Sequence, residues 1–323
     1  MSMQERLVAN RWSRRRFLAW VTAAVGAALL GPACAADTKP GPGSVRRQAP
    51  APSGDQAYLA IARGESPATI TERAVAALGG IERFVAPGDS VVIKPNICVD
   101  YNPPEYAATT NPEVVATLVR LCLGAGAGRV RVMDMPFGGT PESAYAISGI
   151  EVAVQRAGGE MVLMNRAKFL ETPIPDGLDL DKWEIYGDVL NANVIINVPI
   201  AKHHSLARLS LGMKNLLGVI TQPGRIHSNL GQRVADLASV IRPTLTVVDA
   251  VRVLVDHGPT GGSLNDVVRA NTVIASHDFV AADAQAATLF GLTGGDIPYV
   301  RAAAEMGLGT KELGSLKIAE FEV

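Results

Sequence analysis

Cysteine is scarce in this sequence. The 323 residues include three cysteines, Cys34, Cys98 and Cys122. So few thiols exclude a disulfide framework, and they are too few to ligate an iron–sulfur cluster. We expect Cys122 in the core, because it lies on an apolar helical face with Leu118, whereas Cys98 follows a predicted strand and its role stays open. The low count also disfavours a redox accessory protein.

An excess of charge of one sign is also lacking, as are long apolar runs. The formal net charge is −1, so nothing in the composition favours a nucleic acid or an anionic membrane as a partner. The apolar run Trp20–Leu30 has only about half of the ~20 residues that a spanning helix needs. No later run is long enough either, so we expect no membrane span in the mature protein.

The beginning of the chain predicts an export signal. A basic zone, residues 1–19, is followed by the apolar run and then by Ala33-Cys34-Ala35, a small-residue cleavage pattern. Ser13-Arg14-Arg15-Arg16-Phe17-Leu18 resembles the twin-arginine consensus, whose arginine pair is read as an address. We therefore expect the twin-arginine translocase as a partner during export and a periplasmic or extracellular location. An uncleaved anchor and a lipoprotein acylated at Cys34 are the less favoured alternatives.

Three regions follow from these patterns. Residues 1–35 are the predicted signal peptide, and residues 36–56 are rich in proline, glycine and serine, which is typical of a flexible linker. Residues 57–323 are predicted to form one α/β domain. Short, continuously apolar strands alternate there with helices, which indicates a largely parallel sheet with helices on both faces. Residues 165–190 are less regular and are a candidate for a small inserted lobe.

The most apolar predicted strand, Val194–Val198, is expected near the centre of the sheet. Successive side chains of a strand point to opposite faces, so Ile195 and Ile196 should both be buried, one on each face.

Polar side chains follow five of the predicted strands. In open parallel sheets, ligands bind outside the carboxyl ends of the strands, so we expect these side chains to meet at one edge. The residues at the five ends are Lys94, Asp134, Lys202 with His203 and His204, Asp249, and His277 with Asp278. Each has a structural alternative: Asp278 would cap a helix and Asp249 would close a turn. Their convergence nevertheless favours a site.

The densest polar segment, Lys202 to Gly218, matches no standard catalytic motif. Gly212-Met213-Lys214 lacks the glycine frame of a P-loop, and the chain contains neither H-E-x-x-H nor the G-x-S-x-G of an α/β-hydrolase. The glycine-rich run 124–128 ends a predicted helix and precedes a strand, which is the reverse of the order in a dinucleotide fingerprint. We place His204 on a loop and Lys214 at the helix start that follows.

Over about residues 57–320 the chain resembles the domain of unknown function 362 family. The motifs that carry the resemblance are, in order, Val92-Ile93-Lys94-Pro95-Asn96, Thr110-Asn111-Pro112-Glu113-Val114-Val115, Asn197-Val198-Pro199, Lys202-His203-His204-Ser205, Gly212-Met213-Lys214-Asn215-Leu216-Leu217-Gly218, Gly258-Pro259 and Phe279-Val280-Ala281-Ala282-Asp283. Many family members carry a ferredoxin-type cysteine segment. This chain lacks that segment, so the resemblance does not imply electron transfer by that route.

The segment after the predicted central strand is also similar to the nickel-pincer lactate racemase family. In that family a histidine precedes a glycine-flanked, cofactor-bearing lysine, and a further histidine binds the metal. Here His204 precedes Lys214, and His227 follows. The similarity implies that Lys214 carries a cofactor and that His227 binds a metal.

We hypothesise an enzyme of unknown reaction that acts on a small anionic substrate. Its expected catalytic residues are His204, Lys214 and Lys94, because an imidazole exchanges protons near neutral pH and a buried lysine can act as a base or covalent anchor. Its expected cofactor-binding residues are Lys214, Asp134 and Asp249, and His227 is the expected metal ligand. Nickel, zinc or iron would suit a neutral imidazole.

Two other hypotheses use the same residues differently. A periplasmic small-anion binding protein would use the same cations only to hold a small-molecule ligand. A redox accessory protein would need more thiols than the chain has. The substrate, the reaction and the cofactor stay open.

Overall fold

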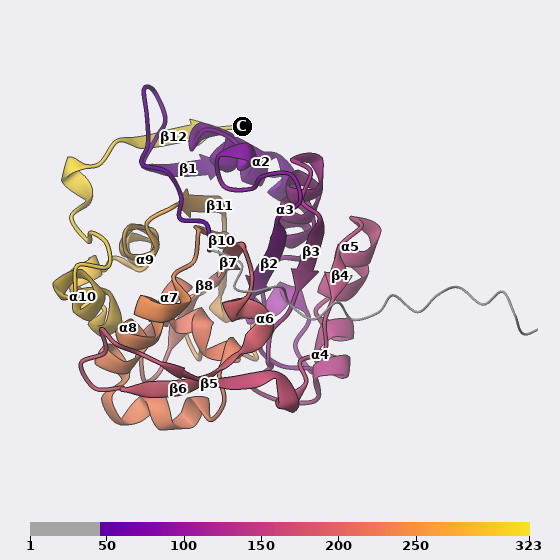
Figure 1. Ribbon diagram of the computed structural model, residues 1–323. Helices are drawn as coiled ribbons and strands as arrows, with labels where there is room; N and C mark the ends of the chain where they lie inside the picture. Colours follow the sequence, from indigo (N-terminus) through magenta and orange to yellow (C-terminus); the bar gives the residue numbers. More distant parts are fainter. Residues whose placement is uncertain (1–45) are drawn as a thin grey trace, which may run out of the picture. The chain divides into compact units, whose positions relative to one another are not determined.

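A computed structural model describes residues 46–323 of the chain (Figure 1). The predicted signal peptide, with Arg14, Arg15 and Cys34, lies outside the described residues, as do residues 36–45 of the predicted linker. No helix in the described part is long and apolar enough to cross a membrane. The described end of the predicted linker, residues 46–56, has no helix or strand. There the backbone N–H of Arg47 donates to the carbonyl of Asn193 (2.7 Å).

A largely parallel sheet runs through the domain in the order β12-β1-β11-β10-β7-β2-β3-β4. Its strands are β1 (Leu59–Arg63), β2 (Ser90–Pro95), β3 (Arg129–Val132), β4 (Glu160–Met161), β7 (Val194–Val198), β10 (Leu245–Leu254), β11 (Val267–Ser276) and β12 (Ile318–Glu322). The strands from β10 to β4 are mutually parallel, and β12 is parallel to β1. Strand β11 runs antiparallel to both of its neighbours. The predicted fold class is confirmed.

The central position of β7 is confirmed as well. The strand lies between β10 and β2, and every one of its residues is buried. Ile195 is 1% exposed and belongs to the apolar core on one face of the sheet. Ile196 is 0% exposed and belongs to the core on the other face. The alternation of side chains along a strand therefore supplies both cores from adjacent residues.

Helices cover both faces of the sheet (Figure 1). One face carries α2 (Pro67–Ala77), α3 (Pro112–Gly124), α4 (Pro141–Ile147) and α5 (Ile150–Arg156). The other face carries α6 (Gly187–Leu190), α7 (Gly212–Asn215), α8 (Leu230–Ile241), α9 (Phe279–Ala287) and α10 (Pro298–Glu305). The starts of α2 and α3 follow directly from sequence, because Ser66 and Asn111 cap the helix and a proline occupies the next position.

The irregular stretch 165–190 contains a separate two-stranded sheet. Strands β5 (Phe169–Pro173) and β6 (Lys182–Tyr186) pair antiparallel, and α6 follows them. The indole N–H of Trp183 donates to the carbonyl of Thr221 (2.8 Å), which fastens this small sheet to the segment after α7.

The polar segment after β7 is more regular than expected. Strand β8 (Ile200–His204) pairs with β10, and it forms a hairpin with β9 (Arg208–Ser210). His204 is thus the last residue of a strand, not part of a loop. Lys214 lies in the short helix α7, as predicted. Strand β8 forms because β10 continues beyond the end of β7 and offers it a pairing edge.

Candidate functional site

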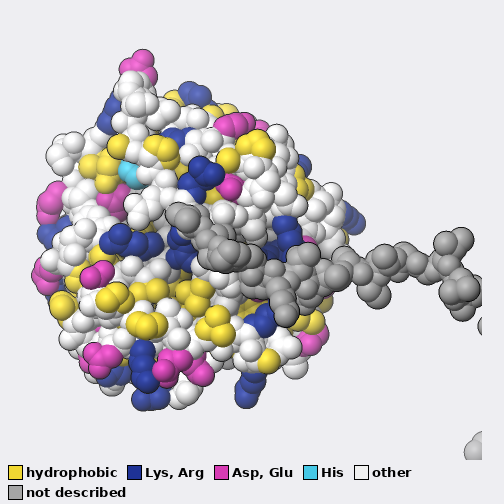
Figure 2. Space-filling model, viewed as in Figure 1, with side chains coloured by type: hydrophobic (Ala, Val, Ile, Leu, Met, Phe, Trp, Pro, Cys, Tyr) yellow, Lys and Arg dark blue, Asp and Glu magenta, His cyan; other side chains and the backbone are white. Residues whose placement is uncertain are grey.

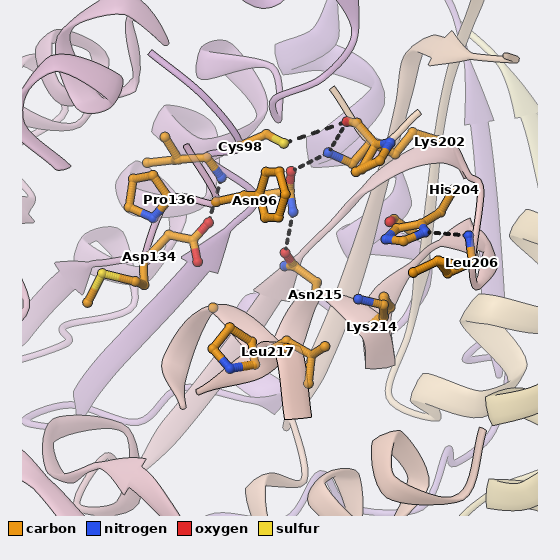
Figure 3. Close-up of a pocket in the computed structure, with 18 of the residues that line it drawn as sticks. Asn96, Cys98, Asp134, Pro136, Lys202, His204, Leu206, Lys214, Asn215 and Leu217 are labelled. Carbon is orange, nitrogen blue, oxygen red and sulfur yellow. Dashed lines mark hydrogen bonds between the residues drawn. The ribbon is translucent and has the colours of Figure 1, made fainter. Parts of the chain in front are cut away.

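A cavity of about 440 Å³ opens at the carboxyl ends of β2 and β7 (Figure 3). Its volume lies in the range of small-molecule sites. Five of the predicted site residues line it together: Lys94, Asp134, His204, Lys214 and His227. They come from the end of β2, the segment after β3, the end of β8, α7 and the 3-10 segment Pro223–Asn229. The sixth, Asp249, does not line the cavity.

An ion pair between Lys94 and Asp134 forms part of the cavity wall. The Nζ of Lys94 lies 2.7 Å from Oδ1 of Asp134, and both side chains are buried. The ammonium also donates to Oδ1 of Asn215 (2.8 Å), and Oδ2 of Asp134 accepts the backbone N–H of Ile97 (2.6 Å). Burial lowers the pKa of Lys94 and raises the pKa of Asp134, and in each case the partner's charge opposes the effect. Each group therefore has the other as its counter-charge.

The ion pair occupies space that is available because residue 218 is a glycine and has no side chain. A Cβ at Gly218 would collide with Oδ1 of Asp134 and crowd Nζ of Lys94. The carbonyl of Gly218 accepts the backbone N–H of Met135 (2.9 Å), which holds the segment after β3 against it. The close approach explains a glycine at this position.

A second buried lysine, Lys202, has only neutral partners. Its Nζ donates to Oδ1 of Asn96 (3.0 Å) and to the carbonyls of Ala108 (2.7 Å) and Pro259 (2.9 Å). Asn96 in turn donates to Oδ1 of Asn215 (3.0 Å), so the amides link Lys202 to Lys94. Among residues 46–323 no carboxylate forms an ion pair with Lys202, and its positive charge is not compensated.

Lys214 projects into the same cavity with no hydrogen bond or ion pair to any other described residue. Burial, and after it the positive charges of Lys202 and Lys94, lower its pKa from the usual 10.5 to about 8. The start of α7 is held from α9: the carboxylate of Asp283 accepts the backbone N–H groups of Gly212 (2.6 Å) and Met213 (2.9 Å). The lysine is therefore fixed at its base and free at its end.

His204 is held as a neutral imidazole. Its Nδ1 accepts the backbone N–H groups of Leu206 (3.1 Å) and Ala207 (3.3 Å). Burial lowers its pKa to about 3, helped by the nearby charges of Lys214 and Lys202. With Nδ1 used as an acceptor, the ring hydrogen is on Nε2, so the imidazole is a hydrogen-bond donor.

His227 lies at the rim of the cavity, and its ring centroid is 6.3 Å from that of His204. Burial, followed by the charge of Lys214, lowers its pKa. Within residues 46–323 no three histidine, cysteine, aspartate or glutamate side chains are grouped so that they could hold a metal ion. Nε2 of His204 carries hydrogen and offers no lone pair. These residues alone do not fit a metal centre, and the metal role of His227 stays a prediction.

Asp249 is an internal anchor. Strand β10 continues to Leu254, so Asp249 lies inside the strand and not at its end. Its carboxylate accepts the backbone N–H of Asn111 (2.7 Å), at the start of α3, and that of Val251 (2.9 Å). Burial raises its pKa to about 6. The structure thus separates Asp249 from the other predicted cofactor-binding residues, Lys214 and Asp134.

The prediction that five strands deliver polar groups to one edge is wrong for β11. Because β11 is antiparallel to β10, Ser276 at its end pairs with Thr246 at the beginning of β10. His277 and Asp278 therefore lie at the opposite edge of the sheet. Oδ1 of Asp278 accepts the backbone N–H groups of Val280 (2.8 Å) and Ala281 (3.0 Å), so this residue caps α9.

Residues 91–288 match the sequence model of the family described as "Domain of unknown function (DUF362)". The chain belongs to this family. The matched region contains every residue that lines the cavity, from Lys94 to Pro259, and also Asp283. The cavity is therefore a feature of the DUF362 part of the chain.

Two individual proteins are similar to this DUF362 chain. The thylakoid-associated protein sll1697 of Synechocystis sp. (strain ATCC 27184 / PCC 6803 / Kazusa) is 27% identical over 240 residues, which are 72% of each chain. The lactate racemase apoprotein of Thermoanaerobacterium thermosaccharolyticum is 14% identical, with a TM-score of 0.43. That match covers 71% of this chain and 56% of the racemase chain.

The structure adds three residues to the predicted site, Asn96, Cys98 and Asn215, which line the cavity together with Lys202, a residue already expected at this edge. The thiol of Cys98 is buried and donates to the carbonyl of Pro259 at a sulfur–oxygen distance of 3.6 Å. Asn96, Lys202 and Asn215 belong to the DUF362 motifs themselves, which was a usable signal in the sequence. Cys98 follows the first of these motifs by two positions.

Charge on the outer surface is mixed. On the face shown in Figure 2, basic and acidic side chains are interspersed, with no broad field of one sign. The concentration of uncompensated positive charge in the cavity contrasts with this surface.

Proposed function

We propose that this protein is an enzyme that acts on a small anionic substrate bound in the cavity. The observation that carries the proposal is the pair of ammonium groups, Lys202 and Lys214, that have no carboxylate partner among the described residues. A buried charge without a counter-charge is costly, and a bound anion would supply the missing charge. Asp134, the carboxylate that lines the cavity, is already neutralised by Lys94.

The side chains suggest distinct roles in such an enzyme. His204 would donate its Nε2–H to an oxygen of the substrate, since a neutral imidazole can polarise such an oxygen. Lys214, with its pKa lowered to about 8, would take up or release a proton next to the bound anion. Lys94 would be held by Asp134 and Asn215 as a fixed positive charge. In this proposal the residue that carries the proton is Lys214, whereas the sequence had suggested His204.

The alternative is a small-anion binding protein, which the same cations would also serve. Proton NMR in D₂O separates the two functions. A pool of small carboxylates and phosphate esters is incubated with a catalytic amount of protein. We expect one compound to lose a signal, gain a new one or exchange a proton for deuterium. Line broadening that needs stoichiometric protein, with no chemical change, would identify a binding protein.

Lys214→Met is the matched control for this experiment. It removes the proposed proton carrier and keeps a side chain of similar length. We expect it to abolish the chemical change. Conversion of the same compound at the parental rate by this variant would contradict the proposed role of Lys214. Metal analysis of protein purified from its native host tests the predicted metal role of His227.

We also propose export by the twin-arginine route, with the mature protein in the periplasm or outside the cell. The proposal is supported by the stretch Ser13-Arg14-Arg15-Arg16-Phe17-Leu18 and the apolar run after it. Replacing both Arg14 and Arg15 by lysine should trap the precursor inside the cell, as judged by cell fractionation. Unchanged export of this variant would contradict the proposal.

A further inference from the structure

The mouth of the cavity is apolar, whereas its interior is basic. Phe137 and Leu206 both line the cavity, and they are 75% and 67% exposed. Single exposed apolar residues are ordinary on protein surfaces. Here two large ones border the same opening, and the prolines Pro136 and Pro223 line it as well. In Figure 3, Pro136 and Leu206 lie on opposite sides of the cavity.

Both exposed side chains stand on backbone that is tied to the cavity itself. The backbone N–H groups of Phe137 (2.8 Å) and Gly138 (3.1 Å) donate to the carbonyl of Cys98. The backbone N–H of Leu206 donates to Nδ1 of His204 (3.1 Å). The apolar groups are thus held at fixed places relative to Cys98 and His204, and their exposure is not that of a loose loop tip.

We infer that the substrate is an amphiphilic anion, with a charged head among Lys202, Lys214 and His204 and an apolar tail against Phe137 and Leu206. The inference rests on the proposed function and narrows it to a class of substrate. A head without a tail would leave the two exposed side chains uncovered. A tail of several carbons would remove them from water, and burial of apolar surface favours binding.

The test measures affinity as a function of tail length at constant head. Acetate, butyrate and hexanoate are titrated into the full chain by isothermal calorimetry. We expect the Kd to fall about two- to fourfold for each added methylene group, as burial of hydrocarbon predicts. The matched alcohol, 1-hexanol, should bind far more weakly than hexanoate because it lacks the charge.

Two variants place the tail. Phe137→Ser and Leu206→Ser should each reduce the ratio of the acetate Kd to the hexanoate Kd, because each removes part of the apolar mouth. Leu178→Ser is the control: Leu178 is 73% exposed and does not line the cavity, so this variant should keep the parental ratio. All three positions are exposed, and unfolding midpoints in urea check that each variant folds.

The outcomes separate the inference from the proposed function. Carboxylates that bind equally well at every tail length would overturn the amphiphilic substrate and leave the anion site intact. An unchanged ratio in both Phe137→Ser and Leu206→Ser would overturn the placement of the tail. Hexanol that binds as tightly as hexanoate, or no binding of any carboxylate, would overturn the proposed anion site and the inference with it.

Discussion

Two groups of buried or partly buried charged side chains in this molecule differ in the hydrogen-bond partners that the protein gives them. The carboxylates of Asp249, Asp278 and Asp283 each accept at least two backbone N–H groups, so the protein itself supplies their hydrogen-bond donors. Lys202 has only neutral acceptors, and Lys214 has no hydrogen-bond partner among the described residues. The first group organises the backbone. The second holds charge that a ligand can neutralise.

The two groups are connected through α7. Asp283, on α9, fixes the beginning of α7, and α7 carries Lys214 and Asn215 into the cavity. A satisfied carboxylate thus holds an unsatisfied lysine in place. The comparison predicts that changes in the first group cost stability and changes in the second cost binding.

The largest effect is expected for Asp283→Ala. Two buried N–H groups, those of Gly212 and Met213, lose their acceptor, which should lower the free energy of unfolding by about 2–5 kcal/mol. Urea unfolding measures the change. Asp283→Asn keeps one acceptor oxygen and should lose less. A free energy of unfolding within about 1 kcal/mol of the parent for Asp283→Ala would mean that Asp283 is not an anchor.

Lys214→Met should have the opposite effect on stability. Removing a partly buried, unpaired charge should raise the free energy of unfolding by about 0.5–2 kcal/mol at pH 7, because functional sites commonly cost stability. The pKa of Lys214 is about 8 in the folded state and 10.5 ordinarily, so the unfolded chain binds more protons between these values. The free energy of unfolding of the parent therefore rises with pH between about 8 and 10.5, and the difference in stability between Lys214→Met and the parent should shrink over this range.

A pH series of urea unfolding curves for both proteins checks this prediction. A variant that is less stable than the parent at pH 7 would show that Lys214 is part of the satisfied group.

His204 provides a smaller effect. Its pKa is about 3 in the folded state against 6.5 ordinarily, so between these values the unfolded chain holds the proton and the folded protein does not. His204 should therefore lower stability as pH falls from 6.5 toward 3, and His204→Gln should remove this part of the acid sensitivity. Nitrogen NMR of the imidazole should show Nε2–H and no titration near pH 6.5. Protonation at that pH would contradict the assignment.

The smallest effect is expected for Asp249→Asn on ligand binding. Asp249 does not line the cavity, so the Kd for hexanoate should stay within about twofold of the parent, whereas Lys214→Met should raise it at least about tenfold. Calorimetry measures both. If Asp249→Asn weakened hexanoate binding as much as Lys214→Met does, Asp249 would have to be part of the binding site.

Much of the fold was predictable from the sequence. Val194–Val198 is apolar at every position except Asn197, which is typical of a central strand that is covered on both faces. Strand direction was not predictable, because Thr272–Ala275 has the same pattern whether it runs parallel or antiparallel. That single reversal moved His277 and Asp278 to the opposite edge.

The site was predictable in its outline. Lys94 lies at the end of β2, Asp134 follows β3 and His204 ends β8. The structure brings these three to one cavity with Lys214 and His227, which come from α7 and the segment Pro223–Asn229. The sequence could not distinguish Asp249 from Asp134, since both follow apolar runs. The difference is that β10 continues past Asp249, because this part of the strand pairs with β11 and β8. The tautomer of His204 was not predictable either, because it is set by the backbone N–H groups of the hairpin turn that donate to Nδ1.

The most direct test of the central claim is the proton balance of anion binding. At pH 9 Lys214, with its pKa of about 8, is mostly neutral, and an anion beside it should raise that pKa and draw in a proton. Calorimetry with hexanoate in buffers of different ionisation enthalpy measures the uptake. The account predicts an uptake of up to roughly one proton at pH 9 and none at pH 6.5, with none at either pH in Lys214→Met. Tight binding at pH 9 with no proton uptake, and with equal affinity in Lys214→Met, would contradict it.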